Sequence, residues 1–344
     1  MKAMAIQKIV QLEDNPNPLN LIEMPIPRPK NDEILIQVKA CGVCHTELDE
    51  IEGRTPPPFF PVVPGHQVVG KVVERGDSAN RFAIGDRVGV AWIFSACGKC
   101  EFCLRGEENL CPEFKATGRD AHGGYAEYMV VKEGFAYPIP ETLDDFQAAP
   151  LLCAGAIGYR SLKLTQIQDG MRLGLTGFGA SAHLVLMMAK ALYPKTDIYV
   201  FSRSESEQQF ALQLGAVWAG DISARAPKLI HAIIDTTPVW KPVLEGMHNL
   251  LPGGRMVINA IRKESNDREL LAELDYPSQL WMEKEIKSVA NVTRKDVEAC
   301  LTLAAQSGIK PEVQVYSLTQ ANQALWELKN RKIRGAKVLD LSLD

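Results

Sequence analysis

Residues 172–182 read RLGLTGFGASA, an apolar run followed by a glycine turn and the start of a helix-length segment. Gly177 and Gly179 let the backbone approach a pyrophosphate, which can rest on the free N–H groups of a helix that starts near Ala180 and Ala182. Standing alone, such a turn is weak evidence for a binding site. Its position between a predicted strand and a predicted helix favours a dinucleotide site.

The turn belongs to a longer pattern in which strands alternate with helices from about residue 155 onward. This alternation predicts a doubly wound parallel sheet, which is an α/β fold. The expected strands are 172–176, 197–201, 229–235 and 255–259, and the expected helices are 181–192, 205–214 and 242–250.

The first 150 or so residues have a different pattern, because short β-like runs are separated there by turn signals rich in proline and glycine. This pattern predicts an antiparallel, barrel-like β domain. After about residue 292, the chain has helical stretches at 294–306 and 318–329 and a final strand at 336–341 that could return to the first domain. A chain of 344 residues exceeds what one hydrophobic core supports, so two domains are expected.

The composition narrows the class of partner. Hydrophobic residues make up 46% of the chain, and the net charge is −4 with a pI near 6.0. We therefore expect no basic face for a nucleic acid or an acidic membrane, and small molecules are the expected partners. The N-terminal residues do not resemble a signal peptide, and no apolar run approaches the roughly 18 residues of a membrane span. These features predict a cytoplasmic protein.

Eight cysteines could form a disulfide framework, but seven lie in the first half of the chain and four of them are clustered. In a reducing cytosol, such clustering favours metal binding. Cys97, Cys100 and Cys103 follow one another at three-residue spacing, and together with Cys111 they can wrap tetrahedrally around one zinc in a lobe at 95–113. Four thiolates leave no position for substrate, which predicts a structural site. Two alternatives stay open: thiols without metal, and an iron–sulfur site, which the spacing weakens but does not remove.

Residues 41–50, CGVCHTELDE, bring two thiols, an imidazole, a hydroxyl and three carboxylates to the end of a strand expected at 34–40. Two thiolates and an imidazole that hold zinc with a fourth position open would form a catalytic site that polarises an alcohol oxygen. The spacing of such residues along the chain does not show that they meet, and a cysteine in an apolar run is usually a small core residue. The candidates are Cys41, Cys44, His66 and Cys153.

The end of the strand after the glycine turn indicates which dinucleotide is bound. NAD sites place an acidic residue there for the ribose 2′-hydroxyl, whereas NADP sites have cationic or small polar groups for the 2′-phosphate. Here the strand ends in Ser202 and Arg203, and no carboxylate follows until Glu205. The sequence therefore favours NADP over NAD. In the alternative interpretation, Arg203 is a solvated turn residue.

Seven motifs, in their order along the chain, closely resemble the zinc-dependent alcohol dehydrogenases of the medium-chain dehydrogenase/reductase (MDR) family. The resemblance implies a GroES-like β-barrel catalytic domain at 1–154, a Rossmann domain at 155–291, and a segment at 292–344 that returns to the catalytic domain. It also implies an active site in the cleft between the domains. The motifs are CGVCHTEL, PGHQVVG, GDRVG, the four-cysteine lobe, GGYAEY, LLCAGAIGY and GFGASAH.

By this resemblance, the ligands of the catalytic zinc fall on Cys44, His66 and Cys153, and Cys41 is a core thiol. Gln67 departs from the family, because many members carry a glutamate beside the ligand histidine. A charge that would tune the zinc and its ligand exchange is therefore missing.

The resemblance also assigns roles around the zinc. Thr46 matches the first group of the proton relay, and His45 matches a position that contacts cofactor phosphate. Asp49 stands where the relay often ends in histidine. Trp92 falls where the family narrows the substrate pocket, which favours primary and modest-sized alcohols, although it could be an ordinary core residue. Arg334 is a candidate phosphate contact or a surface cation.

The sequence thus predicts an NAD(P)-dependent alcohol dehydrogenase with two zinc ions per chain, which interconverts primary or secondary alcohols with aldehydes or ketones. NADP is favoured because Ser202 stands where NAD-preferring members keep an acid. An NADPH-linked aldehyde reductase of the cinnamyl type is the enzymatic alternative, and a dinucleotide-binding zinc protein without turnover is the alternative from another class. The resemblance also implies a homodimer or homotetramer.

Overall fold

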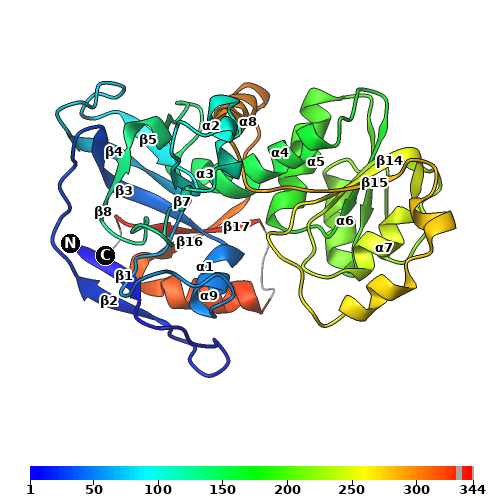
Figure 1. Cartoon of the computed structure of the whole chain (residues 1–344), viewed down its shortest axis with the longest axis horizontal. Coiled ribbons are helices and arrows are strands. Elements are labelled where there is room, and N and C mark those ends of the chain that lie inside the picture. Colours follow the sequence, from blue (N-terminus) through cyan, green and yellow to red (C-terminus); the bar gives the residue numbers. More distant parts are fainter. Residues whose placement is uncertain (331–334, 343–344) are drawn as a thin grey trace. The chain divides into compact units, whose positions relative to one another are not determined.

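The computed structural model of the chain describes residues 1–330 and 335–342. The chain divides into two compact units, one formed by Met1–Cys153 with Val292–Asp344 and the other by Ala154–Asn291. We call them the β unit and the parallel unit (Figure 1). The predicted α/β fold class is confirmed, because one unit has a largely antiparallel sheet and the other a parallel sheet. Arg334 lies outside the described residues.

The parallel unit contains a six-stranded sheet in the order β12-β11-β10-β13-β14-β15, in which all neighbouring strands are parallel. Counted from β10, this is the doubly wound order 3-2-1-4-5-6, with its switch point between β10 and β13. The elements are α4 (Ala156–Leu164), β10 (Arg172–Thr176), α5 (Ala180–Leu192), β11 (Asp197–Phe201), α6 (Glu205–Gln213), β12 (Trp218–Gly220), β13 (Ile230–Asp235), α7 (Lys241–Met247), β14 (Leu250–Ile258) and β15 (Glu285–Ser288).

The central strands of this sheet are buried along nearly their whole length. Each of the strands β10, β11 and β13 has all but one of its residues buried, which is the pattern of a parallel sheet covered on both faces. These are also the strands whose predicted bounds agree best with the structure. In β15 all four residues are exposed, so no apolar pattern in the sequence indicates this edge strand.

The β unit is built on a seven-stranded sheet in the order β16-β17-β3-β4-β5-β9, with β8 also paired to β3. Its neighbouring strands are antiparallel except β16 and β17. Two small sheets, β1-β2 and β6-β7, complete the unit. Its strands are β1 (Lys2–Ile6), β2 (Leu19–Glu23), β3 (Glu33–Val43), β4 (Val68–Arg75), β5 (Arg87–Val90), β6 (Ile93–Ser95), β7 (Lys115–Ala116), β8 (Tyr128–Lys132), β9 (Ala136–Pro138), β16 (Val313–Ser317) and β17 (Ala336–Asp340).

Strand β3 is the centre of the β unit, because it pairs with β4, β8 and β17. Alternate residues on it, Ile34, Ile36 and Val38, belong to the hydrophobic core of the unit. The helices of the unit are α1 (His45–Ile51), α2 (Glu101–Leu104), α3 (Asp145–Pro150), α8 (Arg294–Ser307) and α9 (Ala321–Lys329). None of the helices in the described part of the chain combines the length and the apolar character that crossing a bilayer requires.

A buried lysine ties together the last elements of the β unit. Lys337 on β17 has a fully buried side chain, and its Nζ donates to Tyr316 Oη at 2.6 Å, Glu327 Oε2 at 2.7 Å and Gln314 Oε1 at 3.0 Å. Tyr316 Oη also donates to Glu327 Oε2 at 2.6 Å. Strands β16 and β17 and helix α9 therefore share one charge-assisted network, in which the buried ammonium has a partner for each of its protons.

Replacing the carboxylate of this network should destabilise the protein. The hydrogen bonds from Lys337 and Tyr316 lower the pKa of Glu327 to about 2. Because this pKa is lowered in the folded state, the stabilisation is present above pH ~4.5 and is lost as the pH falls toward 2. We expect Glu327→Gln to lower the free energy of unfolding by roughly 2 kcal/mol at pH 7, measured by urea denaturation.

The difference from wild type should shrink as the pH is lowered below about 4. The matched control is Glu298→Gln, which removes the carboxylate of an exposed pair with Arg81 and should cost less than about 0.5 kcal/mol. Equal effects of the two variants at pH 7 would contradict this account.

Candidate metal and cofactor sites

Three residues that are far apart in the sequence meet in the β unit. Cys44 directly precedes helix α1, His66 lies two residues before β4, and Cys153 lies in the π-helical turn Leu151–Gly155 that follows α3. His66 Nε2 is 3.2 Å from Cys153 Sγ, and the two sulfur atoms are 4.0 Å apart. All three potential ligand atoms lie within 4.8 Å of one another.

The register of β3 and β4 explains why two of these residues meet. In this antiparallel pair, Cys41 lies opposite Val68, so Cys44 and His66 leave the sheet at the same end. Gly65 precedes the histidine with φ +99°, and a Cβ there would lie 2.4 Å from the ring of Tyr125. A residue with a side chain would therefore be strained at this position and would displace the tyrosine.

Glu47 links the two segments. Its Oε2 accepts the backbone N–H of Cys44 at 2.8 Å, and its Oε1 lies 2.6 Å from His66 Nδ1. The contact at Nδ1 leaves Nε2 of the imidazole directed toward the sulfur atoms. Burial alone would lower the pKa of His66, but Glu47 and Cys44 hold that pKa well above its usual range. Hydrogen bonding from Cys153 lowers the pKa of the Cys44 thiol.

The donor set fits a metal ion. One imidazole nitrogen and two sulfur atoms, with a buried carboxylate behind the imidazole, match the chemistry of zinc sites that keep a fourth position open. Cys41 is fully buried beside this group, and burial raises the pKa of its thiol well above the usual range. Gln67 packs against Gly42, where a Cβ would lie 2.5 Å from its Oε1.

The remaining predicted residues around this group have different environments. Thr46 Oγ1 lies 3.6 Å from Cys44 Sγ, whereas His45, the first residue of α1, is exposed. Asp49 is buried and forms an ion pair with Arg54.

Trp92 is half-buried beside the lobe. Its ring centroid is 5.1 Å from that of Phe114, and its backbone carbonyl accepts the N–H of Thr117 at 2.8 Å. The ring thus packs against Phe114, and the backbone beneath it is fixed by the hydrogen bond to Thr117.

Glu50 is a buried group near the metal candidates that the sequence analysis does not single out. Its side chain is fully buried on α1, one turn after Glu47, and among the described residues its carboxylate oxygens have no hydrogen-bond partner. Burial, and next the charge of Glu47, raise its pKa well above the usual range. The three-residue spacing of the two glutamates on a short helix is the signal that could have indicated it.

The four cysteines of the lobe also come together. Cys97, Cys100, Cys103 and Cys111 have sulfur atoms within 4.8 Å of one another, and none of the four is strongly exposed. The backbone N–H of Cys100 donates to Cys97 Sγ at 3.3 Å, and that of Cys97 donates to Cys111 Sγ at 3.5 Å. Backbone N–H groups of this kind stabilise thiolates, so the set fits a closed tetrahedral zinc site.

The lobe is fastened to the rest of the β unit by an ion pair. Glu108 is 2% exposed, and its Oε1 accepts from the backbone N–H of Arg294 at 2.7 Å and from its Nε at 3.0 Å. Arg294 is the first residue of α8. The carboxylate therefore binds both the start of a helix and a guanidinium.

In the parallel unit, the predicted glycine turn joins β10 to α5. Gly177 has φ +75°, and Gly179 is the residue before α5, which begins at Ala180. A Cβ added at Gly179 would meet nothing within 4 Å, so there is open space over the start of the helix. Ala182, in the first turn of α5, is fully buried. An open helix start at the switch point of a doubly wound sheet fits the pyrophosphate of a dinucleotide.

A buried ion pair, Asp235 with Lys263, joins the loops beside this turn. Asp235 Oδ1 at the end of β13 accepts from Thr176 Oγ1 at 2.6 Å and from Thr237 Oγ1 at 2.8 Å. Lys263 Nζ also donates to the carbonyls of Thr237 and Val239, at 2.8 and 2.9 Å. A charged residue at the end of an apolar run was the available signal in the sequence for this pair.

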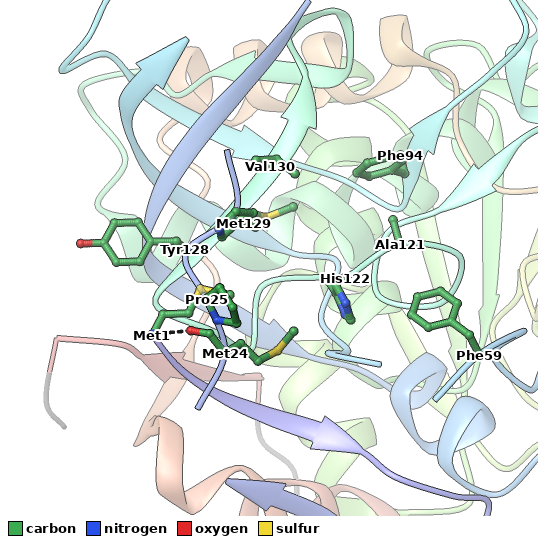
Figure 2. Close-up of a pocket in the computed structure, with 11 residues that line it drawn as sticks. Met1, Met24, Pro25, Phe59, Phe94, Ala121, His122, Tyr128, Met129 and Val130 are labelled. Carbon is green, nitrogen blue, oxygen red and sulfur yellow. Dashed lines mark hydrogen bonds between the residues drawn. The ribbon is translucent and has the colours of Figure 1, made fainter. Parts of the chain in front are cut away.

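The β unit also has an apolar pocket of about 230 Å³ (Figure 2). In it, His122 Nδ1 accepts the backbone N–H of Val63 at 3.2 Å, and burial lowers the pKa of the imidazole. The pocket shares no residue with the two cysteine groups. It is lined by Met1, Met24, Pro25, Pro27, Phe59, Phe94, Ala121, His122, Tyr128, Met129 and Val130.

Comparisons with known proteins identify the family. Residues 30–141 match the alcohol dehydrogenase GroES-like domain. A probable alcohol dehydrogenase AdhA of Mycobacterium tuberculosis is 42% identical over 94% of this chain and 92% of its own length. An alcohol dehydrogenase of Geobacillus stearothermophilus is 32% identical, with 95% and 96% covered.

Solved structures agree with this relationship. A cobalt- and zinc-bound thermostable alcohol dehydrogenase from Pyrobaculum aerophilum superposes with a TM-score of 0.85 at 25% identity, covering 99% of both chains. A cinnamyl alcohol dehydrogenase from Sorghum bicolor gives 0.83 at 27% identity, covering 100% of this chain and 98% of its own. The chain therefore belongs to the zinc-type alcohol dehydrogenases of the MDR family, and the resemblance found in its motifs is confirmed.

The thiol environments predict an order of reactivity after metal is removed with a chelator. Backbone N–H groups of Lys99 and Cys100 lower the pKa of Cys97 to about 7, whereas burial raises the pKa of Cys103 and of Cys300 to about 12. Because the thiolate is the nucleophile, we expect iodoacetamide at pH 7.5 to label Cys97 before Cys103 and Cys300. Peptide mass spectrometry against time measures the order, and labelling of Cys300 before Cys97 in the folded protein would contradict it.

Proposed function

We propose that the chain interconverts a primary or secondary alcohol with the corresponding aldehyde or ketone, using a zinc ion and NAD(H) or NADP(H). The observation that supports this most directly is the meeting of Cys44, His66 and Cys153, whose ligand atoms lie within 4.8 Å of one another. Two sulfur ligands and one imidazole are the donor set of catalytic zinc sites that keep a fourth position for substrate.

When bound, the zinc would supply a Lewis acid for the substrate oxygen, and the dinucleotide would supply the hydride acceptor or donor. Thr46, with its hydroxyl 3.6 Å from Cys44 Sγ, relays the proton of the alcohol in this proposal, because it accepts that proton while it gives its own to the next group. Asp49 follows three residues later on the same helix as a further relay group, and exposed His45 contacts cofactor phosphate. Glu47 fixes the imidazole of His66.

Trp92 limits the size of the substrate in this proposal. Its ring is held against Phe114, so it can act as a firm wall for primary and modest-sized alcohols. The dinucleotide is held by the turn at Gly177 and Gly179, whose open space over the start of α5 accommodates a pyrophosphate.

The proposal includes a second zinc ion in the four-cysteine lobe, with a structural role. It also includes a homodimer or homotetramer, which rests on the family resemblance. None of the eight cysteines, all of which lie in the described part of the chain, is in a disulfide, which fits a reducing compartment such as the cytoplasm.

A second candidate is the reduction of aldehydes with NADPH. It is favoured by the strand end at Ser202 and Arg203, which has no carboxylate of its own. The fold similarity to the Sorghum bicolor cinnamyl alcohol dehydrogenase is consistent with it.

The test of the proposal is an activity panel of alcohols and aldehydes with both cofactors, together with a zinc count per chain. Cys44→Ser should abolish turnover, because it removes a ligand from the three-residue set, while far-UV circular dichroism and dinucleotide binding stay as in wild type. The expected metal content is two zinc ions in wild type and one in the variant. Full activity in a Cys44→Ser protein with verified metal content would sink the assignment.

Replacing a lobe cysteine should affect stability before catalysis. Cys103→Ser should remove one zinc per chain and lower the melting temperature by about 5–10 °C, because a closed metal site contributes folding free energy. Cys300→Ala, which removes a buried thiol outside both groups, should retain both zinc ions. A Cys103→Ser protein that melts at the wild-type temperature would contradict the structural role.

A further inference from the structure

A carboxylate from the following helix lies at the end of β11, where the strand itself has none. Ser202, the residue after the strand, is 2% exposed, and its hydroxyl is hydrogen-bonded to Glu207 Oε2. Glu207 comes from the first turn of α6. The carboxylate five residues further along the chain is thus brought back to the strand end.

Other contacts hold this arrangement in place. The backbone N–H of Ser204 donates to Ser202 Oγ at 3.2 Å, and Gln208 Nε2 donates to the Ser202 carbonyl at 2.6 Å. Ser204 begins the helix, with its Oγ accepting the backbone N–H of Glu207 at 3.4 Å. A carboxylate in the first turn of a helix is also favoured by the helix dipole. The carboxylate is therefore fixed by the fold of the loop.

The strand end lies beside the glycine turn. In the parallel register, Phe201 is opposite Thr176, and the N–H of Gly177 donates to the Phe201 carbonyl at 2.8 Å. Ser202 therefore follows β11 at the level where the turn follows β10. In doubly wound sheets this is the place where the adenosine ribose of a dinucleotide is recognised.

We propose that Glu207 acts as the strand-end acid, accepting a hydrogen bond from the ribose 2′-hydroxyl and repelling a 2′-phosphate, so that the chain selects NAD(H) over NADP(H). The inference rests on the proposed function, because it assumes that the glycine turn binds a dinucleotide. The sequence favours NADP, because Ser202 stands where NAD sites keep an acidic residue. The proposal reverses that expectation.

The groups that could favour a phosphate are weak here. A serine hydroxyl has one proton, and that of Ser202 is donated to Glu207, so no proton is left for a phosphate oxygen. Arg203 is the one cation between 202 and 207, is exposed, and is outnumbered by Glu205 and Glu207. A dianionic phosphate at this strand end would therefore meet a net negative charge.

The test measures equilibrium binding of NAD⁺ and NADP⁺ by isothermal titration calorimetry, without substrate, on the zinc-loaded protein. Wild type should bind NAD⁺ at least about tenfold more tightly than NADP⁺. Glu207→Gln should reduce this ratio by about tenfold, mainly because NADP⁺ binds more tightly once the charge is removed. Glu205→Gln is the matched control, since it removes the same charge from the same helical turn, and it should change the ratio less than about threefold.

Ionic strength provides a second readout. In wild type, the preference for NAD⁺ should decrease as salt is raised from about 0.05 to 0.5 M, because salt screens the repulsion of the 2′-phosphate. In Glu207→Gln the ratio should depend much less on salt.

Three results would overturn the inference. Wild type could bind NADP⁺ more tightly than NAD⁺, or Glu207→Gln could change the ratio no more than Glu205→Gln does. Alternatively, Arg203→Ala could lose most NADP⁺ affinity with NAD⁺ affinity unchanged, which would assign the discrimination to the arginine. If wild type binds neither dinucleotide, the proposed function fails together with the inference. If wild type binds both, and Glu207→Gln leaves the ratio of the two affinities unchanged, the inference alone is overturned.

Discussion

The candidate metal centre depends on one buried carboxylate, that of Glu47. It binds the backbone N–H of Cys44 with one oxygen and approaches Nδ1 of His66 with the other. Burial raises the pKa of Glu47, and the two contacts offset this cost of removing a charge from water only in part. They also fix the start of α1 against the segment before β4. Without this bridge, the register of β3 and β4 would bring the two candidate ligands to the same end of the sheet but would not orient them. Cys153 is then placed beside these two residues by the turn that follows α3.

The fold could be predicted largely from local patterns. In the run 172–182, consecutive residues indicate a strand, a turn and the start of a helix. The structure has β10, the turn at Gly177 and α5 at these positions. Elements without such a pattern escape prediction. Strand β15 is exposed throughout, and it exists because β14 offers it a partner. Helix α1 is short and begins after a cysteine, whereas serine, threonine, aspartate and asparagine are the usual signals.

The candidate sites could be predicted only in part. The lobe cysteines are close in the sequence, so their spacing alone indicated a cluster, and the structure brings them together. Cys44 and Cys153 meet through tertiary structure, and only the family resemblance connected them beforehand. Glu207 was missed for a different reason. The sequence shows which residue follows β11 at position 202. It does not show that the turn into α6 brings the side chain of Glu207 back to that position.

The position of β17 late in the sequence delays the pairing of β3 during synthesis of the chain. Strand β3 ends at Val43 and its neighbour β17 begins at Ala336, so about 290 residues, including the whole parallel unit, separate two adjacent strands. At the usual pace of a ribosome, these residues take roughly 15–60 s to synthesise. During that interval the 40–43 part of β3 has an unpaired edge of N–H and C=O groups, on which strands of other nascent chains could add. The parallel unit, whose strands all lie within Ala154–Asn291, can be complete while the β unit still waits for its last strand.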